Sequence, residues 1–178
     1  MDFWQLAESW SPVWEFESRE LPRALVERCL GAAHAAPAPP GIPPWRFTVL
    51  MAAESRAHLA TAVAAAVGGD AAAVAACRQA PVLVVLSTPA RHGDPPGPGR
   101  GGGGVGACLQ NLVLCAWDAG LGALTLEGAR WGETAAVRAA CALEADEAPC
   151  ALVALGFPAA VPPRRPRPPL AQVTRWMV

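Results

Sequence analysis

The chain has 178 residues and a net charge of -1 at pH 7, and all 14 of its basic residues are arginine. This length suits one domain, spanning 1–178 with short terminal arms, and the near-neutral charge argues against nucleic acid as the main partner because phosphate neutralisation needs a basic surface. A hydrophobic fraction of 53% and a mean hydropathy of +0.27 are high for a soluble monomer of this size, so we expect a partner subunit to cover apolar surface.

The beginning of the chain lacks the basic and apolar regions of a secretory signal, so we expect a cytoplasmic protein. Its six cysteines lie scattered in apolar segments without a C-x-x-C pair. We therefore interpret them as small buried hydrophobic residues rather than redox groups or metal ligands. The three histidines show no ligand spacing, and we expect no metal site.

Residues 1–20 form an acidic arm that is rich in aromatic side chains: Phe3, Trp4, Trp10, Trp14 and Phe16. Aromatic residues this dense at a terminus usually dock onto another surface. Leu21 and Pro22 then begin a predicted helix that runs to His34, with proline in the first turn. The proline-rich stretch 35–44 predicts a stiff loop, because proline removes backbone N–H donors.

The middle of the chain alternates predicted strands and helices. Residues 45–51 are rich in aromatic and branched side chains and predict a strand. Helices follow at 54–67 and 70–79, the second with Asp70 as its N-cap. The apolar run 81–88 predicts a strand that is buried on both faces.

A Pro/Gly-rich stretch, 89–104, predicts a surface loop before the central helix at 105–120. The helix is apolar on nearly every face, so it should be buried all round, and Gly120 suits a left-handed cap at its end. We expect Gln110 and Asn111 to bond a neighbouring backbone or a second subunit. With about 16 residues the helix is shorter than the roughly 20 apolar residues of a membrane span, so we expect no membrane contact.

The last third of the chain predicts a strand at 123–126, a helix at 133–143 and a buried strand at 150–158. An extended Arg/Pro-rich arm, 159–178, follows. Arginine clusters bind anions well because their planar guanidinium groups match phosphate and carboxylate. A merely solvated basic tail explains the same composition equally well.

Four segments of the chain occur in the order typical of the nitroreductase family of flavin enzymes: 22–28, 36–47, 106–122 and 154–170. The chain resembles this family from about Ser11 to Trp176. The resemblance implies an α+β fold in which helices flank a central mixed or antiparallel sheet around a buried central helix. It also implies a dimer whose protomers exchange terminal arms around two FMN sites at their interface.

The resemblance also implies which residues bind the cofactor. Glu127 and Gly128 match the family position for backbone contact with the reactive side of the flavin ring. Arg165 and Arg167 match the basic residues that hold the phosphate near the C-terminus. Pro37 belongs to the Ala-Pro pair of the loop before the first strand.

The chain departs from the family pattern in two places. The N-terminal Arg-Ser-x-Arg-x-Phe motif aligns with 11–16, where the phenylalanine remains and Trp14 replaces an arginine. In the loop before the strand, Ser, Asn and Gln are replaced by residues without side-chain hydrogen bonds, with Pro43 in place of Gln. These changes predict a more hydrophobic substrate pocket, lined by Trp14, Pro43 and Trp45. They also predict weakened FMN binding, because hydrogen bonds to charged groups contribute about 1.5–3 kcal/mol each.

Three functional hypotheses follow. The first is an FMN-dependent oxidoreductase that acts on a small organic substrate, such as a natural product, with NAD(P)H as donor. The second is a flavin-free descendant that binds or transforms an apolar small molecule, and the third is a non-catalytic subunit that pairs with a flavin-binding paralogue. We assign no catalytic residue, since in the first case the flavin carries the chemistry.

Overall fold

The computed structural model describes residues 1–38, 45–67, 71–89, 102–127, 129–132, 134–164 and 166–177. Its strands are β1 (Arg46–Leu50), β2 (Val82–Pro89), β3 (Gly122–Glu127) and β4 (Glu147–Gly156). Its helices are α1 (Phe3–Ser9), α2 (Arg23–His34), α3 (Ala53–Val67), α4 (Ala71–Gln79), α5 (Gly102–Asp118), α6 (Ala129–Gly132), α7 (Ala135–Ala140) and α8 (Leu170–Val173). Within the described ranges, no helix is both long and apolar enough to cross a membrane.

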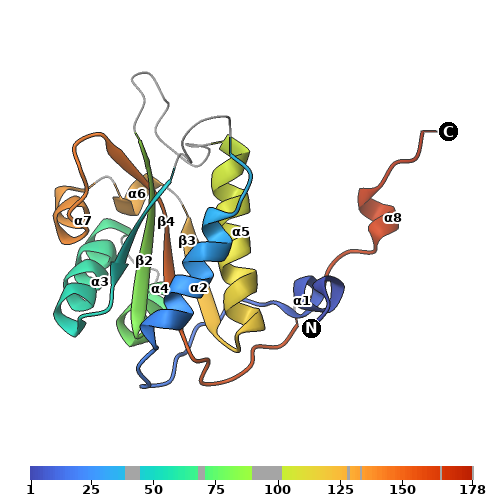
Figure 1. Ribbon diagram of the computed structural model, residues 1–178, viewed down its shortest axis with the longest axis horizontal. Helices are drawn as coiled ribbons and strands as arrows, with labels where there is room; N and C mark the ends of the chain where they lie inside the picture. The colour runs from blue at the N-terminus through green and yellow to red at the C-terminus, as the bar shows by residue number, and fades with distance from the viewer. Residues whose placement is uncertain are drawn as a thin grey trace.

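The four strands form one antiparallel sheet in the order β1-β2-β4-β3 (Figure 1). β2 and β4 are central, and every residue of β2 from Val82 to Thr88 is buried. This confirms the strand predicted to be buried on both faces. β3 lies at one edge of the sheet, which leaves one side of its backbone unpaired within the described sheet.

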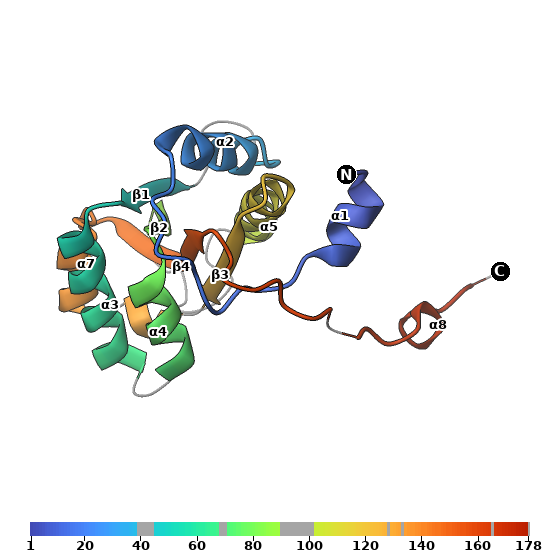
Figure 2. The same cartoon turned by 90° about the horizontal axis from the view of Figure 1, so that it is seen from below.

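Helices cover both faces of the sheet, giving three layers and an α+β fold. Side chains alternate along β2: Val82 and Val84 contact the core under α2 and α5, whereas Leu83 and Val85 contact the core under α3, α4 and α7. Figure 2 shows these two helical layers on opposite sides of the sheet. The alternation follows from the two-residue period of a strand.

The central helix α5 ends as its sequence predicts. Gly120 has a φ of +74°, its N–H donates to Trp117 O (3.0 Å), and the N–H of Leu121 donates to Ala116 O (2.8 Å). This pair of bonds is the Schellman ending of a helix, which favours glycine in the left-handed position. Asn111 Nδ2 donates to Ala32 O in α2 (3.1 Å), which confirms the expected bond to a neighbouring backbone.

Two expectations for α5 are wrong. It begins at Gly102, three residues before the predicted start, and Gly106, Gln110 and Asp118 are exposed rather than buried. The sheet and α2 cover the rest of the helix, but in a single protomer this stripe faces outward. The helix is therefore buried on most of its surface and not all round.

The N-terminal segment after α1 lies along the ends of β3 and β4. Val13 N donates to Ala123 O (3.0 Å) and Glu17 N donates to Phe157 O (2.9 Å). α1 itself is fixed to α5 by Trp117 Nε1, which donates to Ser9 Oγ (3.0 Å).

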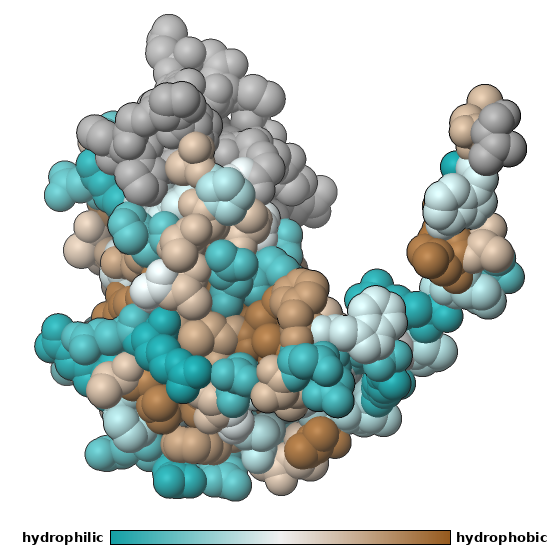
Figure 3. Space-filling view, turned by 45° about the vertical axis from the view of Figure 1, so that its right-hand side comes forward, coloured by the Kyte–Doolittle hydropathy of each residue, from teal (hydrophilic) through white to brown (hydrophobic). Residues whose placement is uncertain are grey.

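The C-terminal segment leaves the body beside α1 and projects away from it with α8 (Figures 1 and 3). The arms at both ends of the chain carry exposed large hydrophobic side chains: Met1, Phe3, Trp4, Val161, Leu170, Val173, Trp176 and Met177. We call these two segments, 1–12 and 159–177, the terminal arms.

Other elements differ in extent from the prediction. The helix expected at 133–143 is the shorter α7, whose N-cap Thr134 accepts a hydrogen bond from Val137 N (3.3 Å). The strand expected at 150–158 begins at Glu147, and the short helices α6 and α8 were not predicted. Asp70, most of the loop at 89–104 and residues 39–44 of the proline-rich loop lie outside the described residues.

Candidate functional site

A cavity of about 860 Å³ lies between α1, the segment that follows it, the edge strand β3 and the C-terminal arm. This volume is within the range of small-molecule sites, about 300–1,000 Å³. We call it the arm cavity. Its walls are Trp4, Ala7, Glu8, Trp10, Ser11, Pro12, Trp14, Leu124, Thr125, Arg164, Pro166 and Arg167.

Three tryptophans give the arm cavity an aromatic wall. Trp14, which the sequence predicted for the substrate pocket, is 38% exposed. Trp10 has a buried Nε1 atom for which the described residues provide no hydrogen-bond partner. Aromatic faces bind flat apolar ligands, and a buried N–H generally needs an acceptor. A ligand with a planar ring and an acceptor atom would satisfy both features.

Two arginines and one carboxylate, that of Glu8, also line the cavity. Arg164 Nε donates to Glu8 O (3.0 Å), and its guanidinium forms an ion pair with the Glu8 carboxylate on α1. Arg167 is exposed, and the described residues offer it no side-chain hydrogen bond or ion pair. Guanidinium groups bind phosphate and carboxylate through paired N–H donors. The donor set therefore fits an anionic group attached to an aromatic ring.

One wall of the cavity depends on the close contact between Val13 in the N-terminal segment and Gly122 in β3. A Cβ atom at Gly122 would lie 2.6 Å from Val13 Cγ2, so a larger residue there would push the N-terminal segment away. With glycine at this position, Val13 packs onto the strand, while Leu124 and Thr125 line the cavity. Glu127, predicted to contact the cofactor, is the exposed last residue of the same strand.

The other predicted residues gather elsewhere. Trp45 is 6% exposed, and its Nε1 donates a hydrogen bond to His34 Nδ1 (3.4 Å). A Cβ atom at Gly104 would lie 3.1 Å from Pro37 O and 3.3 Å from Trp45 Cζ3, so these residues meet at the start of α5. Pro37 is exposed. In this protomer Trp45 is a core residue and does not line the arm cavity.

The two groups lie near opposite ends of α5. Gly104 is close to the beginning of the helix, whereas Trp117 near its end holds α1 and therefore the arm cavity. A rise of 1.5 Å per residue separates these positions by roughly 20 Å along the axis. The structure thus brings Trp14 and Arg167 together but keeps them apart from Pro37 and Trp45. Pro43, Gly128 and Arg165 lie outside the described residues.

Of the residues that line the arm cavity, the sequence predicted only Trp14 and Arg167 as site residues. Trp4 and Trp10 belonged to the arm expected to dock, but no pattern indicated a shared cavity. Arg164 lies beside Arg165, so the arginine cluster pointed to the region without identifying the side chain. Thr125 carries no sequence signal, because only the pairing of strands determines its position.

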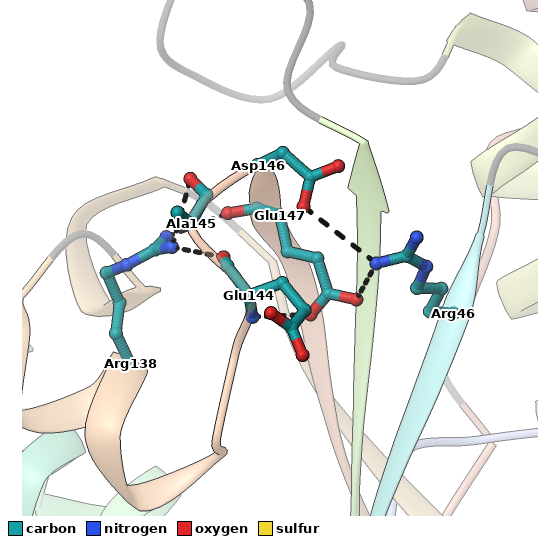
Figure 4. A network of polar contacts seen from close by, with 6 residues as sticks. All are labelled: Arg46, Arg138, Glu144, Ala145, Asp146 and Glu147. Carbon is teal, nitrogen blue, oxygen red and sulfur yellow. Dashed lines mark hydrogen bonds and ion pairs between the residues drawn. The ribbon is translucent and has the colours of Figure 1, made fainter.

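A separate polar network joins the beginning of β4 to β1 and α7 (Figure 4). Arg46 Nη1 pairs with Oε1 of the buried Glu147 at 2.7 Å, and this bond raises the pKa of the Arg46 guanidinium. Arg138 donates to Glu147 O (2.7 Å) and Glu144 O (2.6 Å). Because these groups satisfy one another, we interpret the network as structural support for the sheet.

Three buried cysteines that lie apart from any other thiol contact offer no reactive thiolate at neutral pH. Burial raises the pKa of Cys77, Cys108 and Cys141 to about 11. Thiols with such values stay protonated, and it is the thiolate that attacks or binds metal. Over the described parts of the chain, no group of three or more His, Cys, Asp and Glu side chains is arranged to hold a metal ion.

A model of the nitroreductase family matches residues 13–157. Solved structures support the same fold. A BluB-like flavoprotein from Clostridium difficile 630 is 17% identical with a TM-score of 0.80, and the alignment covers 100% of both chains. A variant of an FMN- and NADPH-dependent nitroreductase from Sphigopyxis sp. strain HMH is 23% identical with a TM-score of 0.79, again covering 100% of both chains.

A third structure, the NADPH:FMN oxidoreductase from Vibrio harveyi complexed with NAD+, is 19% identical with a TM-score of 0.77. The alignment covers 97% of this chain and 75% of that one. No curated protein matched the chain.

Proposed function

Because the chain belongs to the nitroreductase family, we propose that it is an FMN-dependent oxidoreductase that acts on a small organic substrate with NAD(P)H as electron donor. The observation that carries this proposal is the arm cavity beside β3, which is lined by two arginines and three tryptophans. Structural relatives named as FMN- and NADPH-dependent enzymes support the choice of cofactor and donor.

In this proposal Arg164 and Arg167 hold the phosphate of FMN, and Trp10 and Trp14 border the adjoining part of the molecule. Glu127, at the exposed end of the neighbouring strand β3, would contact the ring through its backbone. FMN, when bound, supplies the transfer of hydride between NAD(P)H and the substrate. The protein binds and orients the reactants.

We further propose that a second copy of the chain completes the site. Pro37 and Trp45 lie roughly 20 Å along α5 from the arm cavity, too far to border the same ligand in one protomer. The exposed hydrophobic side chains of the terminal arms offer the apolar surface that such an interface needs. The outward stripe of α5 at Gly106 and Gln110 leaves a further, polar surface open to a partner.

An FMN titration with matched variants tests the proposal. We expect the purified protein to be yellow or to become so with FMN, and to oxidise NAD(P)H in the presence of a quinone or nitroaromatic compound. The Arg167→Met substitution should remove a charged hydrogen bond to the phosphate, worth about 1.5–3 kcal/mol. FMN should then bind roughly 10- to 100-fold more weakly. Arg175→Met, on the same arm but outside the cavity, should leave the affinity unchanged.

Protein that stays colourless at saturating FMN would overturn this function. The tryptophan wall then favours the second candidate, a flavin-free protein that binds an apolar aromatic molecule. In that case quenching of tryptophan fluorescence should report binding of an uncharged aromatic probe. A folded Trp14→Ala variant should lose the binding, whereas Arg167→Met should keep it.

A further inference from the structure

Two cysteines from different helices face each other across the contact of α2 and α5. Cys115 Sγ donates to Arg28 O at 3.8 Å, and Arg28 immediately precedes Cys29 in α2. Cys29 and Cys115 belong to the same hydrophobic cluster between the two helices. The Cys115 sulfur therefore lies against the turn of α2 that carries Cys29, although 85 residues separate the two cysteines in the chain.

Contacts on both sides of this pair fix the register of the two helices. One turn before Cys115, Asn111 Nδ2 donates to Ala32 O (3.1 Å). One turn after it, Asp118 pairs with Arg28 (3.0 Å). Residues at these spacings share one helix face, so α5 presents Asn111, Cys115 and Asp118 to α2 together. The thiols consequently have little freedom to move apart while the helices remain packed.

The neighbouring side chains are small enough to let the two backbones approach closely. Ala33 of α2 and Ala116 of α5 are fully buried in the same core cluster. A disulfide requires Cα atoms usually about 4.4–6.8 Å apart, closer than the axes of helices packed through large side chains. Ala33 lies one turn after Cys29 and Ala116 directly after Cys115, so small side chains are present next to the pair on both helices.

The two thiols differ in their access to solvent. Cys29 is 1% exposed, whereas Cys115 is only partly buried. The pKa of Cys29 is raised to about 12, chiefly by burial and secondly by the Cys115 thiol. A dissolved oxidant therefore reaches Cys115 first, and Cys29 lies behind it as the second thiol.

We propose that Cys29 and Cys115 form a reversible disulfide when the protein meets hydrogen peroxide. The Cys115 sulfur attacks a peroxide oxygen and breaks the O–O bond, which gives a sulfenic acid and one water. Cys29 Sγ then attacks the Cys115 sulfur and gives up its proton to the departing hydroxide, so that the S–O bond breaks with release of a second water. Two thiols are oxidised by two electrons in total, and hydrogen peroxide is reduced to two water molecules.

The other cysteines lack this arrangement. Cys77 and Cys141 belong to the core on the opposite face of the sheet. Cys108 lies seven residues before Cys115 on α5, and Cys150 on β4 is within 3.4 Å of Thr88 Oγ1. The proposal therefore specifies one pairing. The disulfide would join the two helices of one layer and would not depend on a flavin or a second subunit.

Peptide mapping after peroxide treatment tests the pairing directly. We expect native protein to lose about 2 Da, the two thiol hydrogens, and to regain them with dithiothreitol. Trypsin cleaves after Arg28 and Arg46, so Cys29 is alone in its peptide, while Cys108 and Cys115 share the peptide 101–130. Fragmentation should place the bond on Cys115.

Two variants provide the control. Cys115→Ala should abolish the cross-link, whereas Cys150→Ala, which removes another partly exposed cysteine, should form it as the wild type does. The oxidised wild type should also melt at a higher temperature than the reduced protein, because the cross-link restricts the unfolded chain. Wild-type protein in which Cys115 is oxidised to sulfinic acid without a bond to Cys29, or in which another pair forms, would overturn the proposal.

Discussion

Gly120 holds a left-handed backbone conformation at the end of the central helix, and its identity can be tested by substitution. Gly120→Ala should lower the free energy of unfolding by about 1–2 kcal/mol, because a Cβ atom is unfavourable at positive φ. Gly31→Ala is the matched control: Gly31 lies inside α2, and nothing is within 4 Å of a Cβ atom built there. It should stabilise the protein by about 0.5–1 kcal/mol. Denaturant unfolding measures both, and equal effects would refute the assignment.

The buried thiols make stability depend on pH in the alkaline range. The pKa of Cys77, Cys108 and Cys141 rises from 9.0 to about 11 in the folded protein, and that of Cys29 to about 12. Above pH 9 the unfolded chain therefore releases protons that the folded chain retains. Their stabilising contribution is complete below pH 9 and is lost as the pH rises through 11.

We expect the free energy of unfolding of reduced protein to fall above pH 9, by up to about 1.4 kcal/mol per pH unit for each such cysteine. Neither lysine nor tyrosine occurs in the sequence, so few other side chains titrate in this range. Urea unfolding at pH 8, 9, 10 and 11 measures the slope. Cys77→Ala should make it shallower, and an identical slope in that variant would contradict the assignment.

Whole elements were predictable from the sequence where local pattern and packing agree. β2 is an uninterrupted apolar run between two prolines, and α2 starts at a proline, so both were found. The start of α5 was not, because glycines are poor helix formers. Packing outweighs that preference: Gly104 lies so close to Pro37 and Trp45 that even a Cβ atom there would make unusually tight contacts with both.

The candidate site was harder to predict than the fold. The arginine cluster and the aromatic N-terminal arm indicated the regions that form the arm cavity, and the structure brings Trp14 and Arg167 together there. Trp45 was expected in the same pocket. Its burial against His34 and Gly104 depends on how α2, β1 and α5 pack. A single sequence does not encode such distant pairings in any local pattern.

At the scale of elements, the attachment of α1 to α5 can be tested alone. Trp117→Phe keeps the apolar ring but removes the hydrogen bond to Ser9, worth about 0.5–1.5 kcal/mol. Backbone amides of α1 should exchange with deuterium faster in this variant, while those of β2 and β4 keep their rates. Ser9→Ala removes the acceptor of the same hydrogen bond and should speed the exchange of α1 amides in the same way. Unchanged exchange in α1 for both variants would show that other contacts hold the helix.

At the scale of the whole molecule, the arrangement of surfaces explains the composition of the chain. Its apolar side chains fill two cores on either side of one sheet. Most of the large apolar side chains that remain exposed lie on the terminal arms. The arm cavity and the Pro37–Trp45 region lie at different ends of α5. A second copy would both cover the arms and bring these regions together.

Native mass spectrometry of the purified protein with added FMN tests this account most directly. We predict an assembly of twice the 18.4 kDa chain mass with one FMN bound per chain. A monomer that stays free of FMN at saturating cofactor, or a complex with a second chain of different mass, would contradict it.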